Sequence, residues 1–271
     1  MRRSRVRNRI WVVAALILTF WSCYEPEEGC LDPDATNYDV NADNDCDGCC
    51  NLPTYGILMS FLMDGESYVS GDSFLVSSDG IRVEDFHFFI SDVSFLDVDG
   101  NRIEFEDQFN IYGVDGTGTL TFEDFKYYAD NQFRGTFEGF RYGGTLDKIT
   151  FKIGLSEQIN YYDRDSLELN TDLDDAPDEV YLNENEGYEF YSFTVSDLQD
   201  NQLEIVYADA YPLPAVEVNL DGEMISRGFN DDINLFIDFG VIFDGINITT
   251  MDQAEILSRI NLNIPRAFGK R

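Results

Sequence analysis

The sequence predicts an all-β fold, an antiparallel β-sandwich with few short helices, preceded by a disulfide-rich tether. From Tyr55 onward, runs rich in aromatic and β-branched residues alternate with turn signals. Helix signals are few, and four cysteines gather in a short segment before Tyr55. The 271 residues include 22 Phe and 15 Tyr, which is enough apolar surface for one sizeable core.

The clearest strand signal is the stretch 85–93. Alternation places Asp85, His87 and Phe89 on one face and the intervening apolar residues on the other. This run continues to Val98 and meets Asp99-Gly100, a dipeptide typical of a β-hairpin. We expect further strands at residues 56–63, 135–140, 148–154, 188–195, 203–207, 215–220 and 234–239, with turns at Asp79-Gly80, Gly143-Gly144 and Asp221-Gly222.

Helical patterning is confined to two places. Residues 251–260 are expected to form a helix, with Thr250 as N-cap and Leu257 and Ile260 on a common face. A short helical turn is expected within 120–128. The stretch 160–186 is long, acidic and weakly patterned, so we expect a surface loop of the kind that often carries function.

The first 23 residues have the layout of a bacterial lipoprotein signal. Five arginines precede an apolar run at 10–20 that is too short to span a bilayer comfortably. Ser22 and Cys23 follow, so we expect cleavage before Cys23 and lipidation of its thiol. An uncleaved N-terminal anchor is the alternative, and both place the remaining chain outside the cytoplasm at a membrane.

The composition is strongly acidic. The formal net charge is −34, and removal of residues 1–22 takes away five arginines and no acidic residue, giving −39. Such a charge excludes nucleic acid as a partner, because phosphate binding needs a cationic surface. Negative charge serves solubility first, and divalent cation binding is the second interpretation.

The other four cysteines, Cys30, Cys46, Cys49 and Cys50, lie within 21 residues of one another. In an oxidising compartment such a cluster indicates two disulfides. A direct Cys49–Cys50 bridge would need a strained ring, so we expect Cys30 and Cys46 to pair with these two. A zinc site is the alternative, although the segment has no histidine.

Residues 29–46 resemble the short Gly-Cys-x-Asp-Pro-x-Ala-x-Asn-Tyr module of secreted Bacteroidetes proteins, which implies a small stapled spacer. Asp43, Asp45 and Asp47 stand at alternate positions before Gly48, as in the first half of a calcium loop. Position 12 would be Thr54, not Glu, so the loop is incomplete. A polar, disulfide-closed linker is the alternative to a calcium site.

The β-rich part offers little for catalysis. His87 is the only histidine, and the cysteines are confined to the tether. No serine elbow or phosphate-binding loop is present, and acidic pairs are too numerous for any one of them to indicate a glycosidase. We therefore expect a protein that is not an enzyme, with His87 beside Asp85 on a sheet surface.

Four stretches of the β-rich part occur in a characteristic order, at 86–93 with 99–101, at 146–155, at 186–190, and at 238–246 with 263–268. They resemble the Asp-Gly hairpin, the Ile-x-Phe-x-Ile-Gly-Val strand, the Gly-Tyr-x-Phe strand and the closing Leu-Phe-x-Gly and Asn-x-x-x-Ala-Phe elements of the MbnP-like domain family. That family contains β-rich periplasmic or surface proteins named after a copper-binding protein. The resemblance covers about 215 residues and implies the fold and an envelope location.

The resemblance also implies copper binding and a protein partner, but the residues at the expected copper-site positions differ from those of the family. Better-known members bind copper through a modified Trp and nearby donors, and pair with di-haem peroxidase-like proteins. Leu182 and Glu184 stand where many members have Trp-x-Trp, and Tyr207-Ala208-Asp209-Ala210 stands where a His is usual. The two tryptophans, Trp11 and Trp21, lie in the signal. Copper is therefore not expected.

Together these observations predict a signal at 1–22, an acidic Cys-rich tether at 23–52 and an MbnP-like β-sandwich at 53–271. The acidic run after Cys23 resembles export tags of Bacteroidetes lipoproteins, which implies an outer-membrane location facing the periplasm or the cell surface. The expected function is that of a membrane-anchored, non-enzymatic binding or accessory module. Metal binding is the alternative, with calcium at the tether favoured over copper.

Overall fold

The computed structural model describes residues 25–68, 80–105, 124–160, 173, 176–183, 186–208 and 210–271, and the backbone of 108–112 and 118–122. The expected signal and Cys23 therefore lie outside the described residues, as do Glu184 and Asp209. No helix in the described part is long and apolar enough to cross a membrane.

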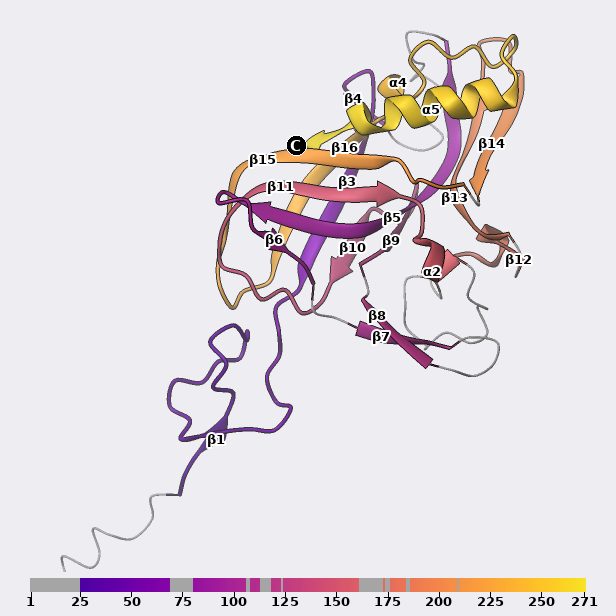
Figure 1. Cartoon of the computed structure of the whole chain (residues 1–271). Helices are drawn as coiled ribbons and strands as arrows, with labels where there is room; N and C mark the ends of the chain where they lie inside the picture. Colours follow the sequence, from indigo (N-terminus) through magenta and orange to yellow (C-terminus); the bar gives the residue numbers. More distant parts are fainter. Residues whose placement is uncertain are drawn as a thin grey trace, which may run out of the picture.

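Two β-sheets face each other and form a sandwich (Figure 1). The smaller sheet has the order β10-β3-β16-β17, with β4 beside β3; the strands are β3 (Tyr55–Met63), β4 (Glu66–Ser67), β10 (Arg134–Phe137), β16 (Asp231–Asp238) and β17 (Phe268–Lys270). The larger sheet has the order β12-β13-β5-β11-β15; its strands are β5 (Arg82–Asp97), β11 (Gly144–Ile153), β12 (Tyr181–Asn183), β13 (Gly187–Ser196) and β15 (Ala215–Ile225), with β6 (Arg102–Ile103), β9 (Lys126–Ala129) and β14 (Gln202–Ala208) at its margins.

Smaller elements complete the fold. Two short pairs lie outside the sandwich sheets, β1 (Glu28–Gly29) with β2 (Asn44–Asp45), and β7 (Gln108–Tyr112) with β8 (Gly118–Phe122). The helical elements are α2 (Glu157–Asn160), the 3-10 turn η2 (Asp178–Val180), α4 (Phe239–Ile242) and α5 (Gln253–Ala267).

The expected antiparallel sandwich is confirmed, with one difference in pairing. The strands of the larger sheet pair antiparallel, whereas β16 runs parallel to β3, from Asp231 beside Tyr55 to Asp238 beside Leu62. Parallel neighbours need a crossover connection, and 167 residues separate Met63 from Asp231. Periodicity along each strand is the same for both directions, so the sequence could not distinguish them.

Strand β5 bears out the alternation read from the sequence. Phe86, Phe88 and Ile90 are buried between the two sheets in the main core. Phe89 points to the opposite face and packs in a second apolar cluster with Tyr188. Both faces of this strand are therefore covered around residues 88–90, which explains why three apolar residues follow one another there.

Part of the expected surface loop at 160–186 is buried. Leu173, Ala176 and Val180 are almost fully enclosed and belong to the second cluster. The remainder of the loop, apart from β12 and its neighbours, lies outside the described residues. The apolar residues of this acidic stretch are widely spaced, so their pattern did not predict a buried segment.

Three local expectations were wrong. The predicted helical turn at 120–128 is the end of β8 and most of β9, because tertiary pairing with β5 overrides weak local propensity. Asp221-Gly222 is not a turn: β15 continues through it as an irregularity in its pairing with β11, and both residues have positive φ. The C-terminal helix starts at Gln253, not at 251.

Helix α5 owes its start to Asp252, not to Thr250. The Asp252 carboxylate accepts from the Glu255 N–H at 2.9 Å, and Glu255 reaches back to the Asp252 N–H, which completes a capping box. The helix extends past Ile260 because Ile264 and Ala267 continue its buried face. Pro265 is tolerated near the C-terminal end.

Candidate functional site

The most distinctive hollow of the described surface lies on the outer face of the larger sheet. We call it the His87 pocket. Its volume is about 380 Å³. Its ionisable lining consists of one histidine and five carboxylates, with no lysine or arginine among the described lining residues: His87, Asp85, Asp130, Glu179, Glu189 and Glu204. Tyr127, Ser192 and Thr194 add polar atoms.

Strands β5, β9, β13 and β14, the 3-10 turn η2 and the residue that follows β9 deliver these side chains. His87 lies on β5 opposite Ser192 of β13 on one side and Ala129 of β9 on the other. The same alternation that buries Phe86 and Phe88 turns His87 outward, and it places Asp85 beside it, as the sequence predicted. The other carboxylates come from positions far apart in the chain, so only the folded sheet brings them together.

His87 makes an electrostatic contact with Glu189. Its Nε2 lies 3.2 Å from Oε2 of Glu189, and the side chains are 16% and 14% exposed. The same Nε2 is buried and has no hydrogen bond of good geometry. The contact is therefore one of proximity and not a well-aligned hydrogen bond, because a hydrogen bond weakens steeply when its angle is poor.

The carboxylates give the pocket a negative electrostatic potential, which adds to burial in raising the pKa of the neighbouring Tyr127. The Tyr127 ring lies 5.9 Å from the His87 ring. Burial, and then the nearby carboxylates of Asp85, Asp130 and Glu189, raise the pKa of Tyr127 to about 12. A cation entering the pocket would therefore be stabilised by several carboxylates at once.

The donor set does not fit copper. His87 is the single imidazole of the chain, and no group of three His, Cys, Asp or Glu donors converges around it among the residues searched. Leu182, where the family resemblance implied a tryptophan, is an apolar side chain, 38% exposed, in strand β12. Carboxylates are hard ligands, whereas copper prefers imidazole and sulfur.

The calcium candidates of the tether are not brought together. Asp43 Oδ2 accepts from the Glu27 N–H at 3.0 Å, and Asp45 Oδ1 accepts from the Leu31 N–H at 3.1 Å. These bonds stabilise the region where β1 pairs with β2. In the described part of the chain, Asp43, Asp45 and Asp47 do not form a convergent group of three donors, so calcium binding there stays a prediction.

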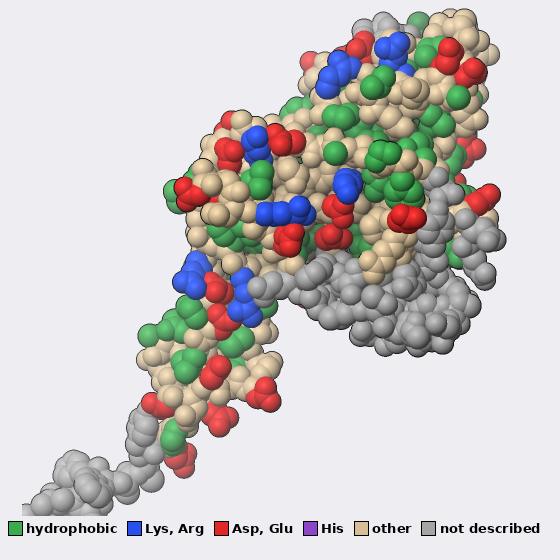
Figure 2. Space-filling model, viewed as in Figure 1, with side chains coloured by type: hydrophobic (Ala, Val, Ile, Leu, Met, Phe, Trp, Pro, Cys, Tyr) green, Lys and Arg blue, Asp and Glu red, His purple; other side chains and the backbone are tan. Residues whose placement is uncertain are grey.

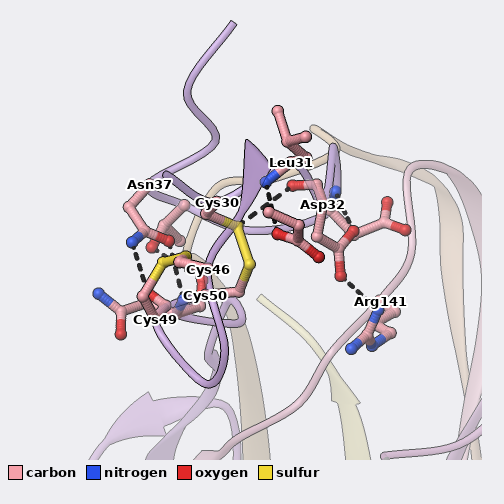
Figure 3. The surroundings of a disulfide bond; sticks show 12 residues. Cys30, Leu31, Asp32, Asn37, Cys46, Cys49, Cys50 and Arg141 are labelled. Carbon is pink, nitrogen blue, oxygen red and sulfur yellow. Dashed lines mark hydrogen bonds and ion pairs between the residues drawn. A yellow bond between two sulfur atoms is a disulfide. The ribbon is translucent and has the colours of Figure 1, made fainter. Parts of the chain in front are cut away.

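The four tether cysteines form two disulfides within the segment 25–52, which we call the stapled module. Cys30 pairs with Cys50, and Cys46 with Cys49, with Cα–Cα distances of 5.0 and 5.6 Å (Figure 3). This agrees with the expectation that Cys30 and Cys46 pair with Cys49 and Cys50. Three of the sulfurs gather closely, and all three belong to disulfides.

These observations define an all-β sandwich domain that carries a disulfide-closed N-terminal module. The chain belongs to the MbnP family, whose sequence profile matches residues 57–258. Among solved structures, MbnP from Methylosinus trichosporium is similar at 9% identity, with a TM-score of 0.39 over 72% of this chain and 79% of that one. A comparison with curated proteins finds no matching sequence.

Proposed function

We propose that this protein is a membrane-anchored lipoprotein of the cell envelope whose MbnP domain is a non-enzymatic binding module. Its ligand is an organic cation, an amine or a guanidinium group, received in the His87 pocket. The observation that carries the proposal is the lining of that pocket, which has five carboxylates and no described basic side chain except the histidine itself.

The shape of the pocket favours an organic cation over a bare metal ion. A metal site needs several donor atoms that converge within a few ångströms. The described carboxylates are instead spread around a hollow of about 380 Å³, which suits a group the size of an amine with its carbon chain. The Tyr127 ring in the wall adds an aromatic surface for such a chain.

Isothermal titration calorimetry with spermidine and agmatine at low ionic strength tests the ligand class. We expect saturable binding of at least one probe, and Glu189→Gln to weaken it by about 5- to 10-fold, or about 1–1.4 kcal/mol. The matched control is Glu217→Gln, which removes the same charge from an exposed position paired with Lys148. It should leave the affinity within about twofold.

Three results would count against the pocket. One is the absence of binding by either probe. Another is an equal loss in the Glu189→Gln and Glu217→Gln variants, which would indicate attraction by net charge alone. The third is tight binding of Cu⁺ or Cu²⁺ that depends on His87, because the proposal excludes copper as the ligand.

Membrane attachment rests on the signal and on Cys23. We expect the wild-type protein in the outer-membrane fraction, and globomycin to cause accumulation of a precursor. In a Cys23→Ala variant the protein should leave that fraction. An unchanged membrane fraction in this variant would contradict lipid anchoring and would favour the uncleaved anchor.

The partner proposed from the family resemblance is a di-haem peroxidase-like protein of the envelope. A pull-down with the anchored protein, followed by a haem stain of the eluate, tests this proposal. If the eluate contains no haem while the protein still binds spermidine, the proposed partner would be contradicted. The proposal of a binding module would be unaffected.

A further inference from the structure

The stapled module ends at Leu52, which is the single residue between the described hydrogen bonds of the module and those of the sandwich. Asn51 is bonded to the module through both its N–H and its C=O, at 2.8 Å each. The Pro53 C=O accepts from the Phe140 N–H at 3.1 Å, and the Thr54 N–H donates to a sandwich side chain at 2.9 Å. Only Leu52 lies between these two hydrogen-bonded segments. The linker is therefore too short to let the module rotate freely relative to the sandwich.

Two ion pairs join the module to the sandwich on the same side. Arg141 donates to Asp32 at 2.6 Å (Figure 3). Arg227 donates twice to Asp34, and its Nη2 lies 3.0 Å from Oδ2. The hydrogen bond from the Arg227 guanidinium is the main reason that the pKa of Asp34 lies below its usual value. Figure 2 shows basic and acidic side chains side by side where the module meets the sandwich.

The backbones also approach closely next to these pairs. Gly228 has φ of +73°, a conformation that favours glycine. A Cβ at this position would lie 3.3 Å from the carbonyl oxygens of both Pro33 and Ala35. The contact therefore combines paired charges with a backbone fit, and exposed ion pairs alone would not give that geometric definition.

We propose that the face made by Arg141, Arg227 and Gly228 is a docking surface whose partner is the acidic loop 32–35 of the same chain. The module is then a rigid stalk and not a flexible spacer. Charge complementarity identifies the occupant, since two carboxylates of the loop meet two guanidinium groups of the sandwich.

Docking of the module also determines how the sandwich is oriented relative to the membrane. This orientation, unlike the docking itself, rests on the proposed anchoring at Cys23. Helix α5 lies at the end of the sandwich far from the module (Figure 1). With the module fixed between the anchor and the sandwich, α5 points away from the membrane. The sandwich would then present one constant end to partners in the envelope.

Pulsed electron double resonance on the full chain tests the docking. Nitroxide labels are attached to p-acetylphenylalanine at the exposed positions of Val40 in the module and Leu262 in α5, which are 76% and 68% exposed, so the native cysteines stay untouched. We expect one narrow distance distribution. The double variant Arg141→Gln/Arg227→Gln should broaden it at least twofold, while circular dichroism stays unchanged.

The matched control is Lys148→Gln/Lys152→Gln, which also removes two cations and two ion pairs from the sandwich. Its distribution should stay narrow. If the arginine variant does not fold, the module-side variant Asp32→Asn/Asp34→Asn makes the same test. A broad distribution in the parent protein, or a narrow one in a folded docking variant, would overturn the proposal. Spermidine titration of the same samples separates this outcome from failure of the His87 pocket.

Discussion

Single aspartates fix two hairpin turns of the larger sheet in the same way. Asp97 Oδ1 accepts from the N–H groups of Asp99 and Asn101, and its Oδ2 accepts from the Asn101 side chain. Asp197 makes the equivalent three bonds to Gln199 and Asn201. These bonds, with the Asn101 side chain first, lower the pKa of Asp97, and the Asn201 side chain does the same for Asp197.

The replacement Asp97→Ala should lower the melting temperature at pH 7. The pKa of Asp97 is depressed in the folded state, so its contribution is full above about pH 4, the ordinary aspartate value, and is lost as the pH falls through the folded pKa. The melting temperatures of the variant and the wild type should therefore converge below pH 4. Asp99→Ala, which removes none of these side-chain bonds, is the control; an equal effect there would contradict the role of Asp97.

Asp238 is the buried counterpart of these turn residues. It is 8% exposed and accepts from three backbone N–H groups, those of Asp64, Gly65 and Gly240, at 2.8 to 2.9 Å. The bonds join the β3–β4 turn to the start of α4. One carboxylate thus holds two segments that are about 174 residues apart.

Asp238→Ala should lower the free energy of unfolding by about 2–4 kcal/mol, because three donors lose their acceptor. Asp238→Asn keeps one carbonyl oxygen and should cost less. Urea denaturation measures both. Asp244→Ala, which removes a 3.8 Å ion pair with Arg266 at the surface, should change the value by less than about 0.5 kcal/mol. A similar cost for Asp238→Ala and Asp244→Ala would contradict this account.

At the scale of an element, the stapled module depends on two disulfides of very different span. The Cys30–Cys50 bridge closes a loop with a sequence separation of 20, whereas Cys46–Cys49 spans 3. Cys30 is also almost fully buried. Because cross-linking removes more entropy from a longer loop, the first bridge should contribute more to the stability of the module.

We expect Cys30→Ser/Cys50→Ser to destabilise the module by about 3 kcal/mol and Cys46→Ser/Cys49→Ser by about 2 kcal/mol. Hydrogen exchange at the Asp39 N–H, which donates to the Cys30 C=O at 2.8 Å, reports on the module alone. Each pair is the control for the other. Faster exchange after loss of the short bridge than after loss of the long one would contradict the loop-length argument.

At the scale of the whole molecule, the excess of acidic residues works against compactness. The formal charge of −34 creates self-repulsion that the described ion pairs offset only locally. Salt screens repulsion between exposed charges over about 8–10 Å at physiological ionic strength.

We therefore expect the melting temperature to rise as sodium chloride increases from 20 to about 300 mM, measured by differential scanning calorimetry. The Asp238→Asn variant is a useful comparison, because salt screens the buried hydrogen bonds of Asp238 less than it screens surface charges. The difference in melting temperature between this variant and the wild type should therefore stay constant as salt increases. A melting temperature that falls with salt would show that attractive surface pairs outweigh the net repulsion.

Features that depend on local order along the chain could be predicted from the amino-acid sequence alone. The alternation along β5 fixed which face carries His87 and which carries Phe86 and Phe88. The cysteine cluster predicted the two staples of the module. These features follow from the period of a strand and from neighbours in the chain, so they needed no knowledge of the fold.

Contacts between residues far apart in the chain depend on the folded arrangement of the strands. Glu179, Glu189 and Glu204 join His87 because the strands of the larger sheet pair in one register, and a shift of one residue would turn His87 inward. Asp32 and Asp34 meet arginines 109 and 193 residues away. In a chain with 52 acidic residues, no local pattern marks the few that share a pocket or a docking surface, because packing and register select them.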